Sequence, residues 1–418
     1  MAAQHSRRSF LTLAGMLTAG SALAACGSNT GRGGSGDTTL HQWYHAYGED
    51  GVQAAVKRYA AAYRGGHVEV QWNPGDYDSK ILTALQSSAI PDVFEAQVKL
   101  DWVRQKQVVP LDDLLGDAKA DFVPELLKSQ TVDGHLYGIP QAIDTQVLFY
   151  RPSLLQAAKI TPPTTVDELV EATKALTKDG VKGLFAGNDG GVSVLMGPLL
   201  WSAGLDYLNA DNTAVGFDDP RAAAAFGKLR DINKSGGLLL GSPTDWSDPG
   251  AFTSKRVAMQ WTGLWNLPKI QEALGDDIGV LPFPAMDASG KPSVPVGAYS
   301  AMVNARSGNV DAAKAFVKWL WVDQVQDQVE FATAFGAHLP ARASLSAKAP
   351  KLQSGVGAQV VKFVADGGKI ASPAWWSARS NTALSDAVAR IAREGANPTQ
   401  ETQKALEVAK AELARARG

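Results

Sequence analysis

Four tryptophans, in two places along the chain, are spaced so that their rings could form a ligand-binding surface. Trp261 and Trp265 lie in the stretch from Val257 to Trp265, and Trp375 and Trp376 are adjacent. An indole presents about 150 to 250 Å² of apolar surface with one N–H donor at its edge, which suits the C–H faces of a sugar ring. Core packing is the alternative role for each ring, so the elements that position them matter.

The first pair is predicted to lie at the end of a short strand. The first half of the stretch from Val257 to Trp265 alternates apolar and polar or small residues, as a half-buried strand does, and then breaks at Thr262-Gly263. The turn is expected to bring Trp261 and Trp265 close together at one strand end.

The second pair is predicted to lie on an irregular segment. Trp375 and Trp376 stand in Ala-Ser-Pro-Ala-Trp-Trp-Ser, where Pro373 and the serines argue against a core strand. Adjacent side chains on a loop rarely both point inward, so we expect one of the two indoles to face a cleft.

The chain begins with an export signal. A twin-arginine region, Arg7-Arg8, precedes a short apolar run and the small residues Leu23-Ala24-Ala25 before Cys26. This arrangement is similar to the lipobox of bacterial lipoproteins. Residues 1–25 are therefore predicted to be a twin-arginine lipoprotein signal peptide, Cys26 to be the lipidated residue instead of a buried small hydrophobe, and residues 26–37 to be a flexible tether reaching roughly 15 to 20 Å.

Size and charge limit what the remaining chain can be. The 418 residues less the signal peptide exceed one usual hydrophobic core, so two lobes are expected. Loss of Arg7 and Arg8 leaves 38 basic against 42 acidic residues without a basic stripe, which excludes nucleic acid and an anionic lipid surface as natural partners. Cys26 is the only cysteine, so the fold needs no internal disulfide.

The body reads as an α/β protein. A strand from Thr38 to Tyr44, a helix from Glu49 to Tyr63, a strand through Val68 and Trp72, and a helix from Asp76 to Ser87 follow each other. This order predicts a parallel sheet, which binds ligands at the carboxyl ends of its strands.

Polar and aromatic residues stand just beyond two of these strands. Trp43, Tyr44 and Tyr47 follow the first strand, and Glu95 and Gln97 follow the strand at 91–94. They are candidate ligand contacts.

Further along, several local signals predict single elements. Asp133-Gly134 predicts a hairpin turn, and Thr165 with Glu168 predicts a capping box that opens a helix. One strand is expected from Val296 to Val303 and one helix from Val310 to Val322, whereas 336–342 is expected to be a loop.

Signals for metals and cofactors are missing. The six histidines are scattered, and the single cysteine is assigned to the lipid. Neither a phosphate loop nor a G-x-S-x-G elbow occurs. No cofactor and no metal are expected.

An ordered set of segments resembles the extracellular solute-binding proteins of ABC importers, of the maltose-binding type. The set covers nearly all of the chain after the tether. It consists of Asp133-Gly134 with Tyr137-Gly138-Ile139-Pro140, Phe149-Tyr150 before Pro162-Pro163, Val257 to Trp265, Ile278 to Pro282, Val296 to Ala301 and Ala374-Trp375-Trp376.

The resemblance implies a periplasmic-binding-protein-like fold. Two α/β lobes would be joined by three crossovers, with a ligand cleft between them. The first lobe would hold residues 38–142 and 298–340, and the second lobe 143–297 and 341–418.

The resemblance also assigns site residues. Asp144 occupies the place of a family carboxylate that accepts sugar hydroxyls, and an ionised acid makes such bonds at about 1.5 to 3 kcal/mol each. Trp265 matches a stacking tryptophan, and Trp376 or its neighbour Trp375 matches another. Further cleft candidates are Trp201, Tyr299 and Arg342.

The function implied is that of a receptor. A monomer, lipid-anchored through Cys26 at the outer face of the cytoplasmic membrane, would capture a carbohydrate, most naturally an oligosaccharide, and deliver it to an ABC importer permease, without being an enzyme. Two alternatives stay open. The same receptor could take a glycerophosphodiester or choline-type ligand, or the chain could be a secreted glycoside hydrolase using Asp144 with Glu95 or Asp92.

Overall fold

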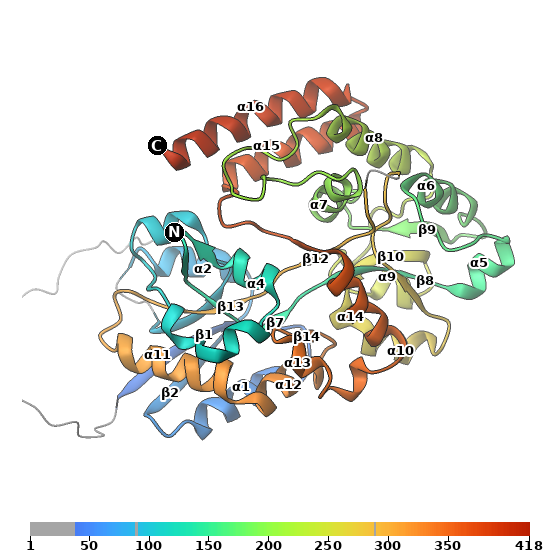
Figure 1. Ribbon diagram of the computed structural model, residues 1–418. Helices are drawn as coiled ribbons and strands as arrows, with labels where there is room; N and C mark the ends of the chain where they lie inside the picture. The colour runs from blue at the N-terminus through green and yellow to red at the C-terminus, as the bar shows by residue number, and fades with distance from the viewer. Residues whose placement is uncertain (1–37, 88–90, 288–289) are drawn as a thin grey trace, which may run out of the picture. The chain divides into compact units, whose positions relative to one another are not determined.

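The computed structural model describes residues 38–418 except 88–90 and 288–289. The predicted signal peptide, Cys26 and the tether therefore lie outside the described residues. Two larger β-sheets, three two-stranded sheets and the helices around them make up the described part, and the chain passes between the two larger sheets three times (Figure 1).

The first sheet has five strands in the order β2-β1-β3-β13-β6. They are β1 (Thr39–His45), β2 (His67–Asn73), β3 (Val93–Ala96), β6 (Ile139–Pro140) and β13 (Ser300–Val303). β1 runs parallel to β2 and β3, which confirms the predicted strand-helix-strand order, and β13 is antiparallel to β3 and β6. The carboxyl ends of β1 and β3 thus lie side by side, and the residues that follow them meet at one edge.

Helices and short turns accompany this sheet. They are α1 (Val52–Ala62), α2 (Tyr77–Ala84), α3 (Leu100–Arg104), η1 (Asp112–Leu114), η2 (Gly116–Asp121), α4 (Pro124–Ser129), α11 (Val310–Lys318), η4 (Trp319–Asp323) and α12 (Val325–Thr333). The single helix predicted to Val322 is wrong in its last turn. The helix widens into the π-helical turn η4, where Gln324 N donates to Trp319 O over 2.9 Å, a bond five residues long.

The predicted hairpin is confirmed. β4 (Thr131–Val132) pairs antiparallel with β5 (His135–Leu136). The two residues between them, Asp133 and Gly134, have φ values of 49° and 83°, the left-handed conformation that a two-residue hairpin turn needs.

The second sheet has four strands in the order β11-β8-β10-β9. They are β8 (Gln146–Tyr150), β9 (Lys182–Phe185), β10 (Val257–Gly263) and β11 (Gly279–Leu281). β10 was expected to be half-buried, but every residue of it is buried. Its polar residues are paired inside: Gln260 Nε2 donates to Asp248 O over 2.8 Å, and Thr262 Oγ1 accepts from Asn266 Nδ2 over 2.8 Å. Alternation of polar and apolar residues in the sequence does not show whether the polar side chains are exposed to solvent or are buried with hydrogen-bond partners.

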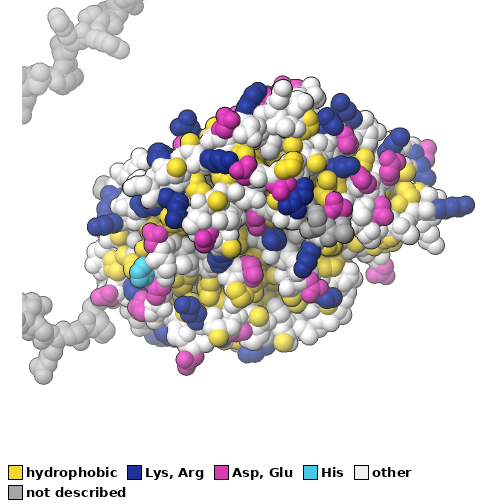
Figure 2. All heavy atoms as spheres, turned by 45° about the horizontal axis from the view of Figure 1, so that its top comes forward, with side chains coloured by type: hydrophobic (Ala, Val, Ile, Leu, Met, Phe, Trp, Pro, Cys, Tyr) yellow, Lys and Arg dark blue, Asp and Glu magenta, His cyan; other side chains and the backbone are white. Residues whose placement is uncertain are grey.

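The helices of the second sheet include the C-terminal ones, which pack side by side with α8 (Figure 1). The elements are α5 (Pro152–Ala158), α6 (Val166–Ala175), α7 (Val192–Ser202), α8 (Pro220–Lys234), α9 (Gly250–Thr253), η3 (Leu264–Asn266), α10 (Leu267–Leu274), α15 (Ala378–Ala389), η6 (Arg390–Glu394) and α16 (Pro398–Arg417). The capping box of Thr165 and Glu168 opens α6 as predicted. Over the described ranges, no helix combines the length and apolar character that crossing a bilayer requires. On the face drawn in Figure 2, Lys and Arg side chains lie scattered among Asp and Glu side chains.

Short strands connect the two sheets. β7 (Ala142–Ile143) pairs antiparallel with β14 (Leu339–Pro340), and β12 (Val294–Val296) pairs with β15 (Gly368–Ile370). Beyond β14 come α13 (Ala343–Ser346), η5 (Pro350–Leu352) and α14 (Gly355–Gly367).

The single strand predicted from Val296 to Val303 is wrong, because β12 ends at Val296 and β13 begins at Ser300. Between them Gly297 leaves the strand path and bridges Asp144. Gly297 O accepts from Asp144 N over 2.8 Å, and Gly297 N donates to Asp144 O over 3.1 Å. The backbone of Asp144 is thereby fixed between two crossovers.

Candidate functional site

The pairing of β7 with β14 brings a histidine to the predicted ligand Asp144. Leu339 pairs with Ile143 in antiparallel register, so the next position places His338 beside Asp144. His338 Nδ1 lies 2.8 Å from Asp144 Oδ1, and His338 Nε2 lies 2.9 Å from Glu49 Oε1. One imidazole thus joins two carboxylates that are far apart in the sequence.

This imidazole is charged at neutral pH. Its burial, with 8% of the residue exposed, lowers its pKa, but hydrogen bonding and the charges of Asp144 and Glu49 outweigh burial and raise the pKa of His338 to about 10. Burial acts to raise the pKa of Glu49, yet the bond from His338 leaves it below its usual range. Cation and anion therefore stabilise each other.

Trp265 covers the other side of His338. The two rings are stacked, with centroids 6.1 Å apart and planes 19° apart. Trp265 Nε1 donates to Ser247 O over 3.2 Å. The indole folds back over the end of β10 because Gly263 has no side chain, as a Cβ there would lie 2.2 Å from the indole ring. The predicted break at Thr262-Gly263 thus positions the tryptophan.

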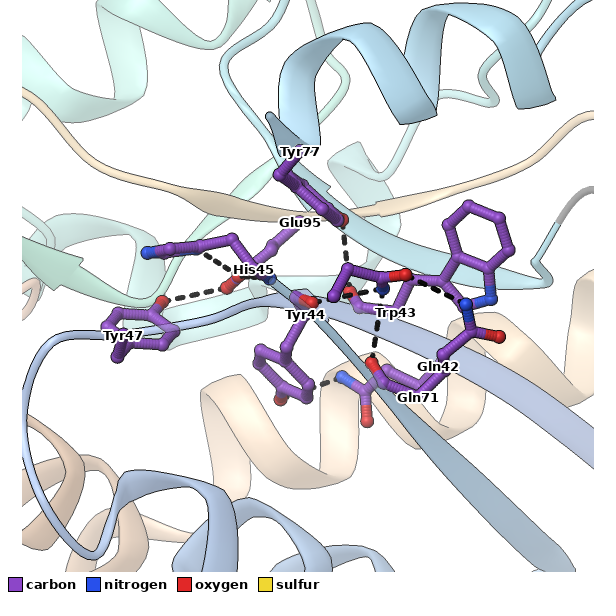
Figure 3. Close-up of polar contacts among 9 residues, drawn as sticks. Gln42, Trp43, Tyr44, His45, Tyr47, Gln71, Tyr77 and Glu95 are labelled. Atoms are coloured by element: carbon purple, nitrogen blue, oxygen red, sulfur yellow. Dashed lines mark hydrogen bonds and ion pairs between the residues drawn. The ribbon is translucent and has the colours of Figure 1, made fainter. Parts of the chain in front are cut away.

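The ends of β1 and β3 add a second imidazole and carboxylate (Figure 3). Glu95, 1% exposed, accepts from His45 N over 2.7 Å and contacts His45 Nδ1 at 2.5 Å, and its other oxygen accepts from Tyr47 over 2.8 Å. The ring of His45 stacks on Tyr299 with centroids 4.3 Å apart. Burial acts to lower the pKa of His45, but Glu95 raises it overall.

Some of these side chains line one pocket, here called the His338 pocket, whereas Glu49, Trp265, His45 and Glu95 are not among its lining residues. It is lined by Tyr47, Gln141, Ala142, Asp144, Tyr299, Phe331 and His338. Gln141 is 2% exposed, and neither of its amide atoms has a hydrogen-bond partner. A buried polar group without a partner costs about 1 to 3 kcal/mol, so this amide marks a place where a solute would gain bonds.

The His338 pocket is collapsed. It encloses about 10 Å³, whereas ligand pockets typically hold about 300 to 1,000 Å³. A solute of ordinary size does not fit into this volume in the conformation described.

Trp375 lies in a different place, here called the Trp375 cavity. This cavity of about 560 Å³ is lined by Arg104, Leu127, Lys128, Thr131, Asp133, Gly134, Asp211, Asn212, Trp375 and Arg417. The indole centroid is 5.2 Å from Arg104 Cζ and 6.0 Å from Arg417 Cζ. Ala374 O accepts from Leu100 N over 3.2 Å, which ties the segment to the start of α3.

Trp376 is partly buried and packs against the hydrophobic core of the second sheet. Its ring lies 5.1 Å from that of Tyr207 and 6.0 Å from that of Phe217, and its Nε1 donates to Asn381 Oδ1 over 3.3 Å. The segment carrying both indoles is irregular, as predicted.

Three predicted contacts lie inside hydrophobic cores. Trp261 is 1% exposed and donates to Gln146 Oε1 over 2.8 Å, and Trp201 is 3% exposed and donates to Asp206 Oδ1 over 3.1 Å. Tyr44 is fully buried beside α1. The structure does not bring these three to the His338 pocket.

The other candidates, Trp43, Gln97 and Arg342, are not among the residues that line the His338 pocket. Trp43 is half-buried, and its carbonyl accepts from Tyr77 over 3.2 Å (Figure 3). Gln97 is half-buried and does not line the pocket. Arg342 pairs with Asp121 at 2.9 Å and anchors the chain after β14.

Sequence reasoning did not name His338, Glu49 or Gln141 as contacts, and it included His45 only within the stretch from His41 to Tyr47 that it placed at a ligand edge. The loop at 336–342 was predicted, but nothing local shows that its histidine pairs with Asp144. Glu49 and His45 flank Tyr47 at the predicted ligand edge, so that edge was the signal available. Over the ranges that the structure describes, no three His, Cys, Asp or Glu side chains are placed to hold a metal ion.

Comparison with known proteins places the chain in a family context. A protein of Brucella abortus is 32% identical over 195 residues, 44% of this chain and 47% of its own length. The chain thus spans about half the length of that relative. The diacetylchitobiose binding protein DasA of Streptomyces coelicolor is 25% identical over 376 residues, 82% of this chain and 86% of its own length.

Solved structures share the two-lobe fold. The GacH receptor of Streptomyces glaucescens, solved unliganded and with acarbose, has a TM-score of 0.76 at 24% identity over 90% of this chain and 99% of its own. UgpB from Mycobacterium tuberculosis, in complex with glycerophosphocholine, has a TM-score of 0.74 at 20% identity over 92% and 100%. Residues 45–327 match the family model described as bacterial extracellular solute-binding protein. This chain belongs to the family of bacterial extracellular solute-binding proteins.

Proposed function

We propose that the protein captures an uncharged carbohydrate in the His338 pocket and delivers it to the permease of an ABC importer. The observation that carries this proposal is the buried amide of Gln141, which lacks partners beside the carboxylate of Asp144. A sugar hydroxyl both donates and accepts, so it satisfies an amide and a carboxylate together. Trp265, whose ring stacks on that of His338, would offer an apolar face to the sugar once it parts from the imidazole.

Capture requires movement. Trp265 lies in η3, directly after β10 of the second sheet, whereas Glu49 follows β1 of the first sheet. Separation of the lobes would part Trp265 from His338 and open the pocket. Closure over a sugar would then desolvate the hydrogen bonds of Asp144 and Gln141 and strengthen them.

A glycerophosphodiester is the second candidate, because a neighbour with the same fold is solved with glycerophosphocholine. A phosphodiester is an anion and calls for arginine or lysine. The residues that line the His338 pocket include neither, and Asp144 stands among them. Pocket charge therefore favours the uncharged solute.

A glycoside hydrolase needs two free carboxyl groups beside the bond. Both oxygens of Glu95 are engaged, one by His45 and one by Tyr47. Asp92 accepts from His41 N over 2.8 Å and from Ser307. These bonds favour binding over turnover, and release of reducing sugar by the pure protein would contradict that choice.

The test is a titration of the protein without its signal peptide, followed by tryptophan fluorescence. The probes are maltose, galactobiose, N,N′-diacetylchitobiose and glycerophosphocholine. A saturable change with at least one saccharide is expected. A response to glycerophosphocholine alone would transfer the site to phosphodiesters, and no response to any saccharide would overturn the proposal.

Attachment to the outer face of the cytoplasmic membrane through Cys26 is part of the same proposal, and rests on the lipobox-like sequence. Cys26→Ala is expected to move the exported protein from the membrane fraction to the soluble fraction. A chain that stays with the membrane after this change would contradict the anchor. The monomeric state is checked by light scattering on the soluble form.

A further inference from the structure

We infer that His338 sets the charge selectivity of the His338 pocket. Its imidazolium holds Asp144 in place for a solute hydroxyl while carboxylates remain in excess around it, so the pocket accepts uncharged sugars and rejects acidic ones. This inference rests on the proposed function and adds the class of sugar to it.

The position of His338 is fixed by the backbone on both sides. His338 N donates to Ala332 O over 2.9 Å, and the next residue enters the ladder of β14 with β7. A Cβ on Gly336 would lie 2.9 Å from Glu49 Oε1 and 3.2 Å from His338 Nε2. A glycine at this position is therefore what lets Glu49 approach the ring.

Nε2 of His338 is bonded to Glu49, and Nδ1 is buried beside Asp144, so neither ring nitrogen is exposed to an entering anion. Nε2 donates to Glu49, and Nδ1 forms a close ion pair with Asp144 without an aligned hydrogen bond. The side chain of His338 is 9% exposed, whereas that of Asp144 is 32% exposed. Asp144 is thus the member of the pair that a solute reaches.

The charges around His338 leave a negative excess. Three carboxylates, those of Glu49, Glu95 and Asp144, surround two imidazoles, those of His338 and His45. On the neighbouring helices, Lys269 of α10 is exposed and donates to Gly48 O, and Glu330 of α12 is paired with Arg58. Solvent screens Lys269, so an entering carboxylate or phosphate meets net negative charge in a poorly screened place.

A glutamine at position 338 removes the positive charge and keeps a side chain of similar size, so it separates the effect of the charge from the effect of packing. In His338→Gln, Glu49 and Asp144 lose the cation between them, and their repulsion favours uptake of a proton by one of them as the pH falls. Affinity for galactobiose is expected to fall at least tenfold at pH 7 and to recover towards pH 5. The wild-type protein is expected to show a flat profile from pH 5.5 to 8.

The matched control is His135→Gln, which removes an exposed histidine that pairs with Asp112 at 3.2 Å outside the pocket. It is expected to leave affinity and pH profile unchanged. The double variant Glu49→Gln with His338→Gln removes cation and anion together, and is expected to fold and to bind galactobiose with a flat profile. This double variant keeps the inference open to test where His338→Gln alone fails to fold.

The experiment is calorimetric titration with galactobiose and digalacturonic acid, a matched uncharged and acidic pair. At least tenfold preference for galactobiose is expected in the wild type. Equal affinity for both, or the same flat profile in His338→Gln as in His135→Gln, would overturn the inference. If no saccharide binds, the proposed function is wrong, and the charge of His338 is then tested separately by histidine NMR at pH 8. A ring protonated on both nitrogens is expected, and a neutral ring overturns the charge assignment.

Discussion

The His338 pocket and the Trp375 cavity each combine an indole with charged side chains, but they do so in opposite ways. In the first, Trp265 lies against a buried imidazolium held by two carboxylates, and the space left is about 10 Å³. In the second, Trp375 lies under the exposed guanidinium groups of Arg104 and Arg417, beside a cavity of about 560 Å³. By volume alone, the Trp375 cavity would be the better candidate for a binding site.

The difference shows that solvent decides how much such contacts are worth. A cation over an exposed aromatic ring contributes about 0.5 to 1 kcal/mol, and salt screens it. Hydrogen bonds to a charged group that is shielded from water contribute about 1.5 to 3 kcal/mol each. We therefore expect selectivity to come from the collapsed pocket, and each prediction below pairs a change there with a matched change in the open cavity.

The largest effect is expected from the carboxylates. Asp144→Ala removes the proposed acceptor for solute hydroxyls and leaves His338 with one partner, so saccharide affinity is expected to fall about 100-fold. Asp133→Ala removes a carboxylate from the Trp375 cavity and is expected to change affinity less than threefold. Calorimetry on both variants checks the pair, and a larger loss in Asp133→Ala would move the solute to the other region.

The tryptophans give the next largest contrast. Trp265→Ala removes the indole over the His338 pocket and is expected to weaken saccharide binding at least tenfold. Trp375→Ala is expected to weaken it less than threefold, because arginines already occupy positions over its ring. Fluorescence titration measures both, and equal losses would mean that the sugar spans the two regions.

Sequence reasoning reached the fold and part of the site. Strand and helix periodicity gave the parallel start of the first sheet, and Thr165 with Glu168 gave a helix start, because these signals are local. The family resemblance put Asp144 and Trp265 among the candidates, and both now lie at one imidazole. The structure thus shows that Asp144 and Trp265 both contact His338, and their binding of a solute stays a prediction.

What the sequence did not give depends on distant partners. His338 meets Asp144 through the register of β14 with β7, which no local pattern encodes. Trp261 and Trp265 share one stretch, yet Trp261 is in the core because Gln146 of the neighbouring strand accepts its N–H. Whether each of two indoles four residues apart is buried depends on the neighbouring strand that it contacts, and not on their spacing in the sequence.

A third contrast concerns pH and stability. The pKa of His338 is about 10 in the folded chain and about 6.5 when unfolded, so unfolding between these values releases a proton. Stability from this group is complete below pH 6.5 and is lost as pH rises, by about 1.4 kcal/mol per unit. Glu49 has the opposite sign: its contribution is present above 4.5 and is lost as pH falls through its lowered pKa.

Urea unfolding from pH 7 to 9.5 measures this slope. His338→Gln is expected to lose most of it, whereas Arg104→Ala in the Trp375 cavity is expected to keep it, because a guanidinium stays charged throughout this range. Parallel slopes in the wild type and in His338→Gln would show that the two carboxylates do not hold the imidazolium.

The smallest effect is expected from the arginines around Trp375. Arg104 follows β3 in the first sheet region, whereas Arg417 ends α16, so together with Trp375 they connect the two lobes at a place away from the His338 pocket. Two exposed contacts of about 0.5 to 1 kcal/mol each shift a closing equilibrium only modestly, and the apparent affinity follows the closed fraction. The double variant Arg104→Ala with Arg417→Ala is expected to weaken saccharide binding about threefold at low salt and less at 0.5 M salt. Arg415→Ala, on the same helix but paired with Glu412, is the control and is expected to have no effect. A loss above tenfold in the double variant would give the open cavity the larger share of binding and reverse the comparison.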